Sequence, residues 1–127
     1  MNGVLYVALG GALGASARHL LGIATLKSFG PGYPYGTMAA NVIGGFLMGV
    51  LAGWLALKVS GGTNLRLFLG VGMLGGFTTF SAFSLDVILM YEKKAYAAML
   101  GYVGGSVILS LGALMLGLIL ARKVFGT

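Results

Sequence analysis

The sequence predicts an all-α membrane protein with four transmembrane helices, and three observations support this prediction. Of the 127 residues, 58% are hydrophobic and 8% are charged, against roughly 25% charged in an ordinary soluble domain. Four apolar stretches each approach or exceed the roughly 20 residues that cross a hydrocarbon core. Because the connections between them are short, we expect residues 1–127 to form a single integral membrane domain.

The four expected spans follow one another closely. The first covers about 3–26 and contains Arg18, the one charge well inside a span. The second, over 37–57, and the fourth, over 95–121, carry no charge, and the third, over 65–91, has a charge-free centre. We therefore expect a multi-pass protein of the plasma membrane, which is the inner membrane in a bacterium with two membranes.

Composition excludes several classes of function. The chain has no Cys, one His and two carboxylates, Asp86 and Glu92, so we expect neither an enzyme nor a familiar metal site of these side chains. The net charge is +6, but the basic residues are scattered singly or in pairs. Because phosphate-binding residues cluster on one face, we expect no nucleic-acid partner.

The basic residues divide evenly between the two sides of the membrane. An excess of Lys and Arg normally marks the cytoplasmic side, and here neither side has one. Such a chain can insert in either orientation, and a two-fold dimer of opposite orientations is then the simplest assembly. We therefore predict an antiparallel homodimer with dual topology. One side carries Lys58, Arg66, Arg122 and Lys123, and the other carries Arg18, Lys27, Lys93 and Lys94.

The centre of the third span is polar. Two glycines are followed by two threonines and two serines within 75–84, and Thr78 is the midpoint of the span. One interpretation is a broken helix whose freed carbonyls face protein, water or an ion. The other is an unbroken helix whose hydroxyls bond to their own carbonyls. Both remain open on composition. In a two-fold dimer, two such breaks would meet and form a cation site.

Glycines four residues apart predict close packing between helices, because small residues let two backbones approach. The repeated spacing occurs at Gly10 and Gly14, at Gly45, Gly49 and Gly53, at Gly72 and Gly76, and at Gly101 and Gly105.

The segment 75–83, which reads GGFTTFSAF, closely resembles the signature of the Fluc (CrcB) family of fluoride channels. Further similarities follow in order: 11–18 in the first span, 36–45 in the second, and the polar positions of the fourth. The resemblance thus covers all four spans. Ala82 is a departure, because family members usually carry Thr or Ser there.

The resemblance implies a double-barrelled channel of two antiparallel subunits that passively exports fluoride from the cytoplasm. It also implies a structural sodium ion (Na+) at the dimer centre, held by the backbone carbonyls of Gly75 and Thr78. Amide, hydroxyl and ring-edge groups would replace the water around fluoride. The implied pore residues are Asn41, Thr79, Phe80, Phe83, Tyr102, Ser106 and Ser110.

Two alternatives stay open at this point. Arg18 either draws anions toward a vestibule or braces a loop by bonding carbonyls. The chain also resembles small four-span multidrug antiporters in size and topology. Those proteins exchange protons for cationic compounds through a carboxylate inside the membrane, and the only carboxylates here lie at the end of the third span.

Overall fold

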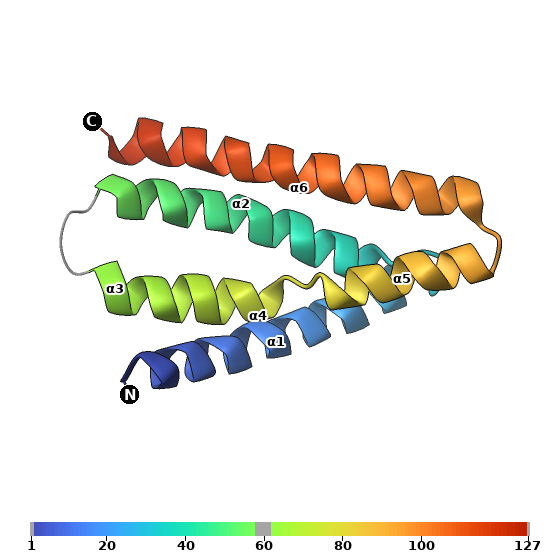
Figure 1. Ribbon diagram of the computed structural model, residues 1–127, viewed down its shortest axis with the longest axis horizontal. Helices are drawn as coiled ribbons and strands as arrows, with labels where there is room; N and C mark the ends of the chain where they lie inside the picture. The colour runs from blue at the N-terminus through green and yellow to red at the C-terminus, as the bar shows by residue number, and fades with distance from the viewer. Residues whose placement is uncertain (1, 58–61, 127) are drawn as a thin grey trace.

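The computed structural model describes residues 2–57 and 62–126, and within them the chain is helical apart from short connections (Figure 1). Residues 58–61, with Lys58 of the charge count, lie outside the described residues, as do the two terminal residues. The elements are α1 (Asn2–Phe29), α2 (Tyr35–Leu57), α3 (Gly62–Leu65), η1 (Arg66–Leu74), α4 (Gly75–Phe77), α5 (Ser81–Glu92) and α6 (Tyr96–Phe125).

Four segments of the described chain are long and apolar enough to cross a membrane. The third of them joins α3, η1, α4 and α5 in one bent span. This confirms the prediction of a multi-pass, all-helical protein with four spans. The spans are Gly3–Phe29, Tyr35–Ala56, Thr63–Glu92 and Tyr96–Phe125.

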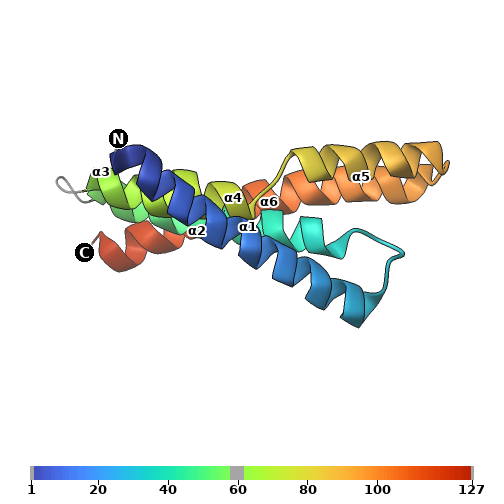
Figure 2. The ribbon, with the colours of Figure 1, turned by 90° about the horizontal axis from the view of Figure 1, so that it is seen from below.

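The helices form two packed pairs, and α2 of the first pair also contacts α1 and η1 of the second. α2 runs along α6, while α1 runs along η1 and α4. Beyond the break, α5 leaves α1 and lies beside α6 (Figures 1 and 2). Both chain ends lie at one end of the bundle, and the connections α1–α2 and α5–α6 lie at the other.

Close glycine contacts hold both pairs together. A Cβ added at Gly14 of α1 would meet the backbone of Met73, and one added at Gly49 of α2 would meet that of Leu114. The spacing therefore predicted close packing correctly at these positions. Gly101 differs, because a Cβ there would meet no atom of the chain within 4 Å.

The first half of the third span is a π-helix, which the sequence did not predict. In η1 the backbone closes with a wider turn, so that the N–H of Gly75 reaches the carbonyl of Gly70, five residues back. Gly72 sits directly against α1, where a Cβ would come within 2.8 Å of the Val7 carbonyl. π-helical segments are rare and often occur at functional sites. This one leads directly into α4 and the break that follows it.

The third span breaks at Thr78. α4 ends at Phe77, and Thr78 is extended, with φ −85° and ψ 157°. α5 begins at Ser81, so two further residues complete the irregular stretch. The broken interpretation is therefore correct and the unbroken one is wrong. Figure 2 shows the change of direction between α4 and α5.

Candidate functional site

The irregular stretch 78–80, at which the third span breaks, is held by a side chain from another helix. Asn41, on α2, accepts a hydrogen bond on Oδ1 from the Thr79 backbone N–H at 2.8 Å. Its Nδ2 donates to the Thr79 carbonyl at 3.0 Å. One amide side chain thus satisfies both backbone groups of Thr79, which the break leaves without helical partners. This pairing fixes the break next to the centre of α2.

The hydroxyl of Thr79 starts the next helix. Thr79 Oγ1 accepts the backbone N–H of Ala82 at 3.1 Å and lies 3.3 Å from Ser81 Oγ. A threonine in this place satisfies one of the first N–H groups of a helix, as N-cap residues do. Ala82 takes part in this bond through its backbone N–H, so the bond does not require a hydroxyl on the side chain at this position.

These two replacement hydrogen bonds leave two carbonyl groups without their helical donors. In a continuous α-helix the N–H of Thr79 would bond to the Gly75 carbonyl, and that of Ala82 would bond to the Thr78 carbonyl. Here the first N–H goes to Asn41 and the second to Thr79 Oγ1. The two carbonyls implied as sodium ligands are therefore the two that lose these helical donors. Neutral carbonyl oxygens are ligands that hard cations accept, so the pair fits such an ion.

Arg18 braces the same turn from α1. Its Nε donates to the Gly76 carbonyl at 3.2 Å, and the two residues are 58 positions apart in the chain. The side chain is half-buried and also borders a shallow cavity beside His19. A hydrogen bond to a carbonyl at the break is what the bracing alternative requires.

A cavity of about 430 Å³ lies beside the break. We call it the inner cavity. Its walls come from α2, α4, the irregular stretch 78–80, α5 and α6, and eight of its nine lining residues were singled out from the sequence. The lining residues are Asn41, Gly75, Thr78, Thr79, Phe80, Phe83, Ser106, Val107 and Ser110.

Two serine hydroxyls of the inner cavity lack a partner in the described part of the chain. Ser106 and Ser110 are four residues apart on α6, so they share one face. The Oγ atoms of both are buried, and neither has a hydrogen-bond partner among the described residues. Because a buried hydroxyl without a partner costs about 1–3 kcal/mol, these groups are suited to bind an ion or a water molecule.

Two phenylalanine rings form another wall of the inner cavity. The ring centroids of Phe80 and Phe83 are 5.8 Å apart, and their planes are tilted by 43°. Phe80 is 79% exposed. The hydrogen atoms at a ring edge carry partial positive charge, so such rings can face an anion edge-on.

Tyr102 does not line the inner cavity, although it lies on the same face of α6 as Ser106. It is fully buried, and its hydroxyl donates to Asp86 Oδ2 at 2.9 Å. Its ring lies 5.2 Å from that of Phe83 and 5.6 Å from that of Tyr33. Tyr102 therefore separates the inner cavity from the residues beyond it.

A second cavity, of about 450 Å³, lies beyond Tyr102. We call it the outer cavity. It is lined by the α1–α2 connection, which includes Tyr33, and by Asp86 and Lys93. Partial burial, and to a lesser degree the neighbouring Tyr35, raises the pKa of the Tyr33 phenol above its ordinary value.

Sequence reasoning missed Asp86 and Tyr33 as members of the site. A carboxylate within a span is by itself a signal of pairing or function, and Asp86 meets that criterion. Tyr33 gave no comparable signal, because only the tertiary structure brings the α1–α2 connection against α6. Its contact with Tyr102 joins residues 69 positions apart.

The chain matches one protein family over most of its length and is similar to named proteins over nearly all of it. Residues 5–118 match the family described as "CrcB-like protein, Camphor Resistance (CrcB)". The chain is 58% identical to a protein of Phenylobacterium zucineum over 126 residues, which are 98% of this chain and 99% of the relative. It is 53% identical to one of Caulobacter vibrioides (strain NA1000 / CB15N), with the same coverage. Both relatives are named "Fluoride-specific ion channel FluC".

Proposed function

We propose, because the chain belongs to the CrcB-like family, that it forms a passive fluoride-selective ion channel. The observation that carries the proposal is the inner cavity, which gathers an amide, hydroxyls and ring edges beside the break and contains no charged side chain. The names of the relatives favour this function over the antiporter alternative.

Fluoride is small and strongly hydrated, so a pathway must offer donors in place of water. Asn41 uses one amide hydrogen on the Thr79 carbonyl and keeps the second free. The hydroxyls of Ser106 and Ser110 have no partner among the described residues, and the edges of Phe80 and Phe83 add weak positive charge. Several weak neutral donors let an ion enter and leave, whereas a fixed positive charge would trap it.

The working assembly in this proposal is an antiparallel homodimer with two separate pores. Two features of the described chain support a second copy at the break. Phe80 is largely exposed, and Gly75, whose carbonyl has lost its helical donor, is exposed as well. Hydrocarbon does not satisfy a free carbonyl, so a second protein surface is needed there. The balanced charges described above allow that copy to insert in the opposite orientation.

The dimer centre in this proposal holds one sodium ion through the carbonyls of Gly75 and Thr78 from each subunit. Four oxygens would surround the ion, and its charge would offset the carbonyl dipoles that the two breaks release. Because the ligands are backbone atoms, the side chain of Thr78 is free to bond elsewhere. Its Oγ1 donates to the Leu74 carbonyl at 2.9 Å.

Growth in fluoride tests the function in cells. Hydrogen fluoride crosses a membrane as a neutral acid and ionises in the cytoplasm, so a channel that releases the anion protects the cell. Expression in a bacterium that lacks its own fluoride exporter should restore growth on fluoride medium. Normal amounts of membrane-inserted protein without any rescue would contradict the proposal.

A topology reporter tests the assembly. Fused to the C-terminus, it should report from both sides of the membrane, because each dimer contains both orientations. Reporting from one side alone would rule out dual topology and would leave the fluoride assay unaffected.

A further inference from the structure

The buried side chain of Tyr102 lies between lining residues of the two cavities of one subunit. Phe83 borders the inner cavity, whereas Asp86 and Tyr33 border the outer cavity. Tyr102 contacts all three and borders neither cavity. An ion that passes between the two cavities on this path must therefore displace the Tyr102 ring or move around it.

In addition to the ring of Phe83, two contacts hold Tyr102 in the separating position. The first is the hydrogen bond from its hydroxyl to Asp86, at 2.9 Å. The second is the ring of Tyr33, which meets it at 5.6 Å with an interplanar angle of 89°. This edge-to-face geometry is one of the two favoured arrangements of aromatic pairs. It opposes rotation of the Tyr102 ring toward the outer cavity.

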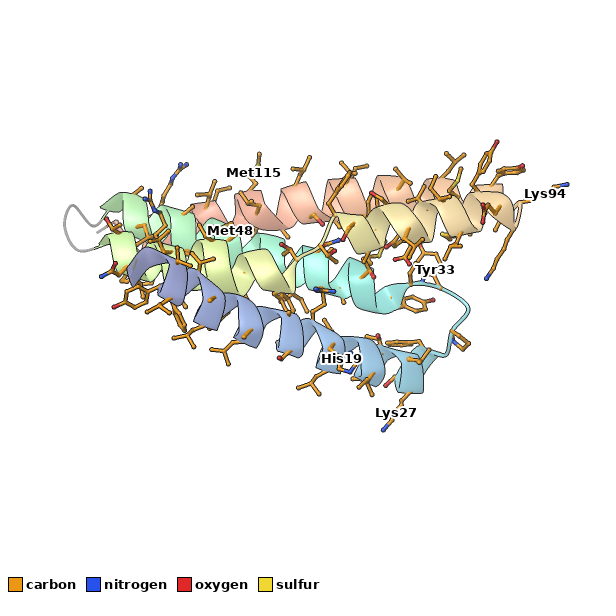
Figure 3. All side chains as sticks on the ribbon, turned by 60° about the horizontal axis from the view of Figure 1, so that its bottom comes forward. His19, Lys27, Tyr33, Met48, Lys94 and Met115 are labelled. Carbon is orange, nitrogen blue, oxygen red and sulfur yellow. The ribbon has the colours of Figure 1, made fainter. Side chains whose placement is uncertain are left out.

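The connection that carries Tyr33 is built to hold its position. Pro31 and Pro34 flank it and restrict the backbone on both sides, and the Tyr33 carbonyl accepts the N–H of Tyr35 at 2.8 Å. The rings of Tyr33 and Tyr35 also lie 4.9 Å apart. Figure 3 shows Tyr33 turned inward at the end of the bundle where Lys27 and Lys94 point outward.

From these contacts we infer that Tyr33 is a positioning residue that keeps Tyr102 between the two cavities and thereby limits the rate of ion passage. The inference rests on the proposed channel function. In this inference the α1–α2 connection affects the rate of ion permeation through its contact with the Tyr102 ring. The Tyr33 hydroxyl has no role in it, because the contact is made by the ring.

Fluoride release from liposomes separates this role from a merely structural one. Tyr33→Ala should raise the rate about two- to tenfold, which corresponds to the loss of one aromatic pair. Tyr33→Phe keeps the ring and should retain the wild-type rate. Tyr91→Ala is the matched control, because it removes an equal side chain from the same end of the bundle, where Tyr91 contacts Tyr96. Its rate should also stay at the wild-type value.

A labelling measurement tests the inference without fluoride. The chain has no Cys, so Val107→Cys provides a single thiol on the inner cavity. A charged, water-soluble thiol reagent should modify it about two- to tenfold faster when Tyr33→Ala is added, but not when Tyr33→Phe is added. If Tyr33→Ala does not yield a folded dimer, Tyr33→Leu replaces it with the same expectations.

The outcomes distinguish the two proposals. A wild-type protein that releases no fluoride contradicts the channel, while the labelling rates still test Tyr33. If the wild-type protein conducts fluoride, two results would overturn the role of Tyr33. One is an unchanged or lower flux in a folded Tyr33→Ala or Tyr33→Leu variant, and the other is an unchanged labelling rate in that variant. An equal rise in the Tyr91→Ala control would overturn it too.

Discussion

Asn41 binds both backbone groups of Thr79, with its Oδ1 2.8 Å from the Thr79 nitrogen and its Nδ2 3.0 Å from the Thr79 oxygen. The Asn41 side chain thereby replaces the helical hydrogen-bond partners that Thr79 loses at the break. The two bonds also orient the amide, because only one assignment of its oxygen and nitrogen satisfies both. The remaining N–H is the group that we propose for fluoride, so one residue connects the fold to the function.

Asn41→Asp should abolish fluoride release and lower stability. The carboxylate retains the acceptor for the Thr79 N–H but has no N–H to donate, and its charge repels an anion. The unpaired Thr79 carbonyl should reduce the free energy of unfolding by about 1–3 kcal/mol. Asn64→Asp, at an exposed position of α3, is the control for the added charge. Wild-type efflux from the Asn41→Asp variant would contradict the assigned role.

Arg18 variants distinguish bracing from electrostatic attraction. Gln carries its amide nitrogen as many bonds from Cα as the Arg Nε, so Arg18→Gln can keep the bond to the Gly76 carbonyl without the charge. We expect it to retain most of the fluoride flux. Arg18→Ala should lose about 1–3 kcal/mol of stability. If both variants lose flux equally while thermal unfolding stays unchanged, the charge and not the hydrogen bond is what matters.

Gly14→Ala should destabilise the protein, because the new Cβ would collide with the Met73 backbone and push η1 away from α1. The expected cost is about 1–3 kcal/mol, as for overpacking elsewhere. Gly22→Ala lies on the same helix, where a Cβ would meet no atom within 4 Å. It should leave stability unchanged or raise it slightly. Equal thermal unfolding temperatures for the two variants would show that α1 and η1 are not held at this distance.

Removal of sodium should weaken the dimer. Replacing Na+ by a large organic cation at equal ionic strength should cost about 2–3 kcal/mol, the stabilisation that a ligand gives well above its dissociation constant. Thermal unfolding and dimer dissociation would measure this difference. Identical stability in the two salts would contradict the carbonyl site of Gly75 and Thr78.

The broad fold followed from the sequence because each of its causes is local. Hydropathy located the four spans, and the polar midpoint at Thr78 marked the position at which one of two open interpretations placed a break. The glycine spacing likewise predicted close packing between helices, which the structure shows where α1 meets η1. None of these inferences required knowledge of which helices are neighbours.

The remaining features depend on contacts between distant parts of the chain. The bonds between Asn41 and Thr79 join residues 38 positions apart, and that from Arg18 to Gly76 spans 58. The π-helix arises at a glycine contact with α1, and glycine spacing alone does not distinguish it from an α-helix. The contact of Tyr33 with Tyr102 exists only because the α1–α2 connection turns inward.

The most direct test of the fluoride channel is anion release from liposomes that contain the purified protein, recorded with fluoride and chloride electrodes. The account predicts fast release of fluoride without release of chloride. It also predicts that Phe80→Ile abolishes the release, because this change removes a ring edge from the inner cavity, while Phe29→Ile at the exposed end of α1 does not. Equal release of both anions, or undiminished fluoride release from Phe80→Ile, would contradict it.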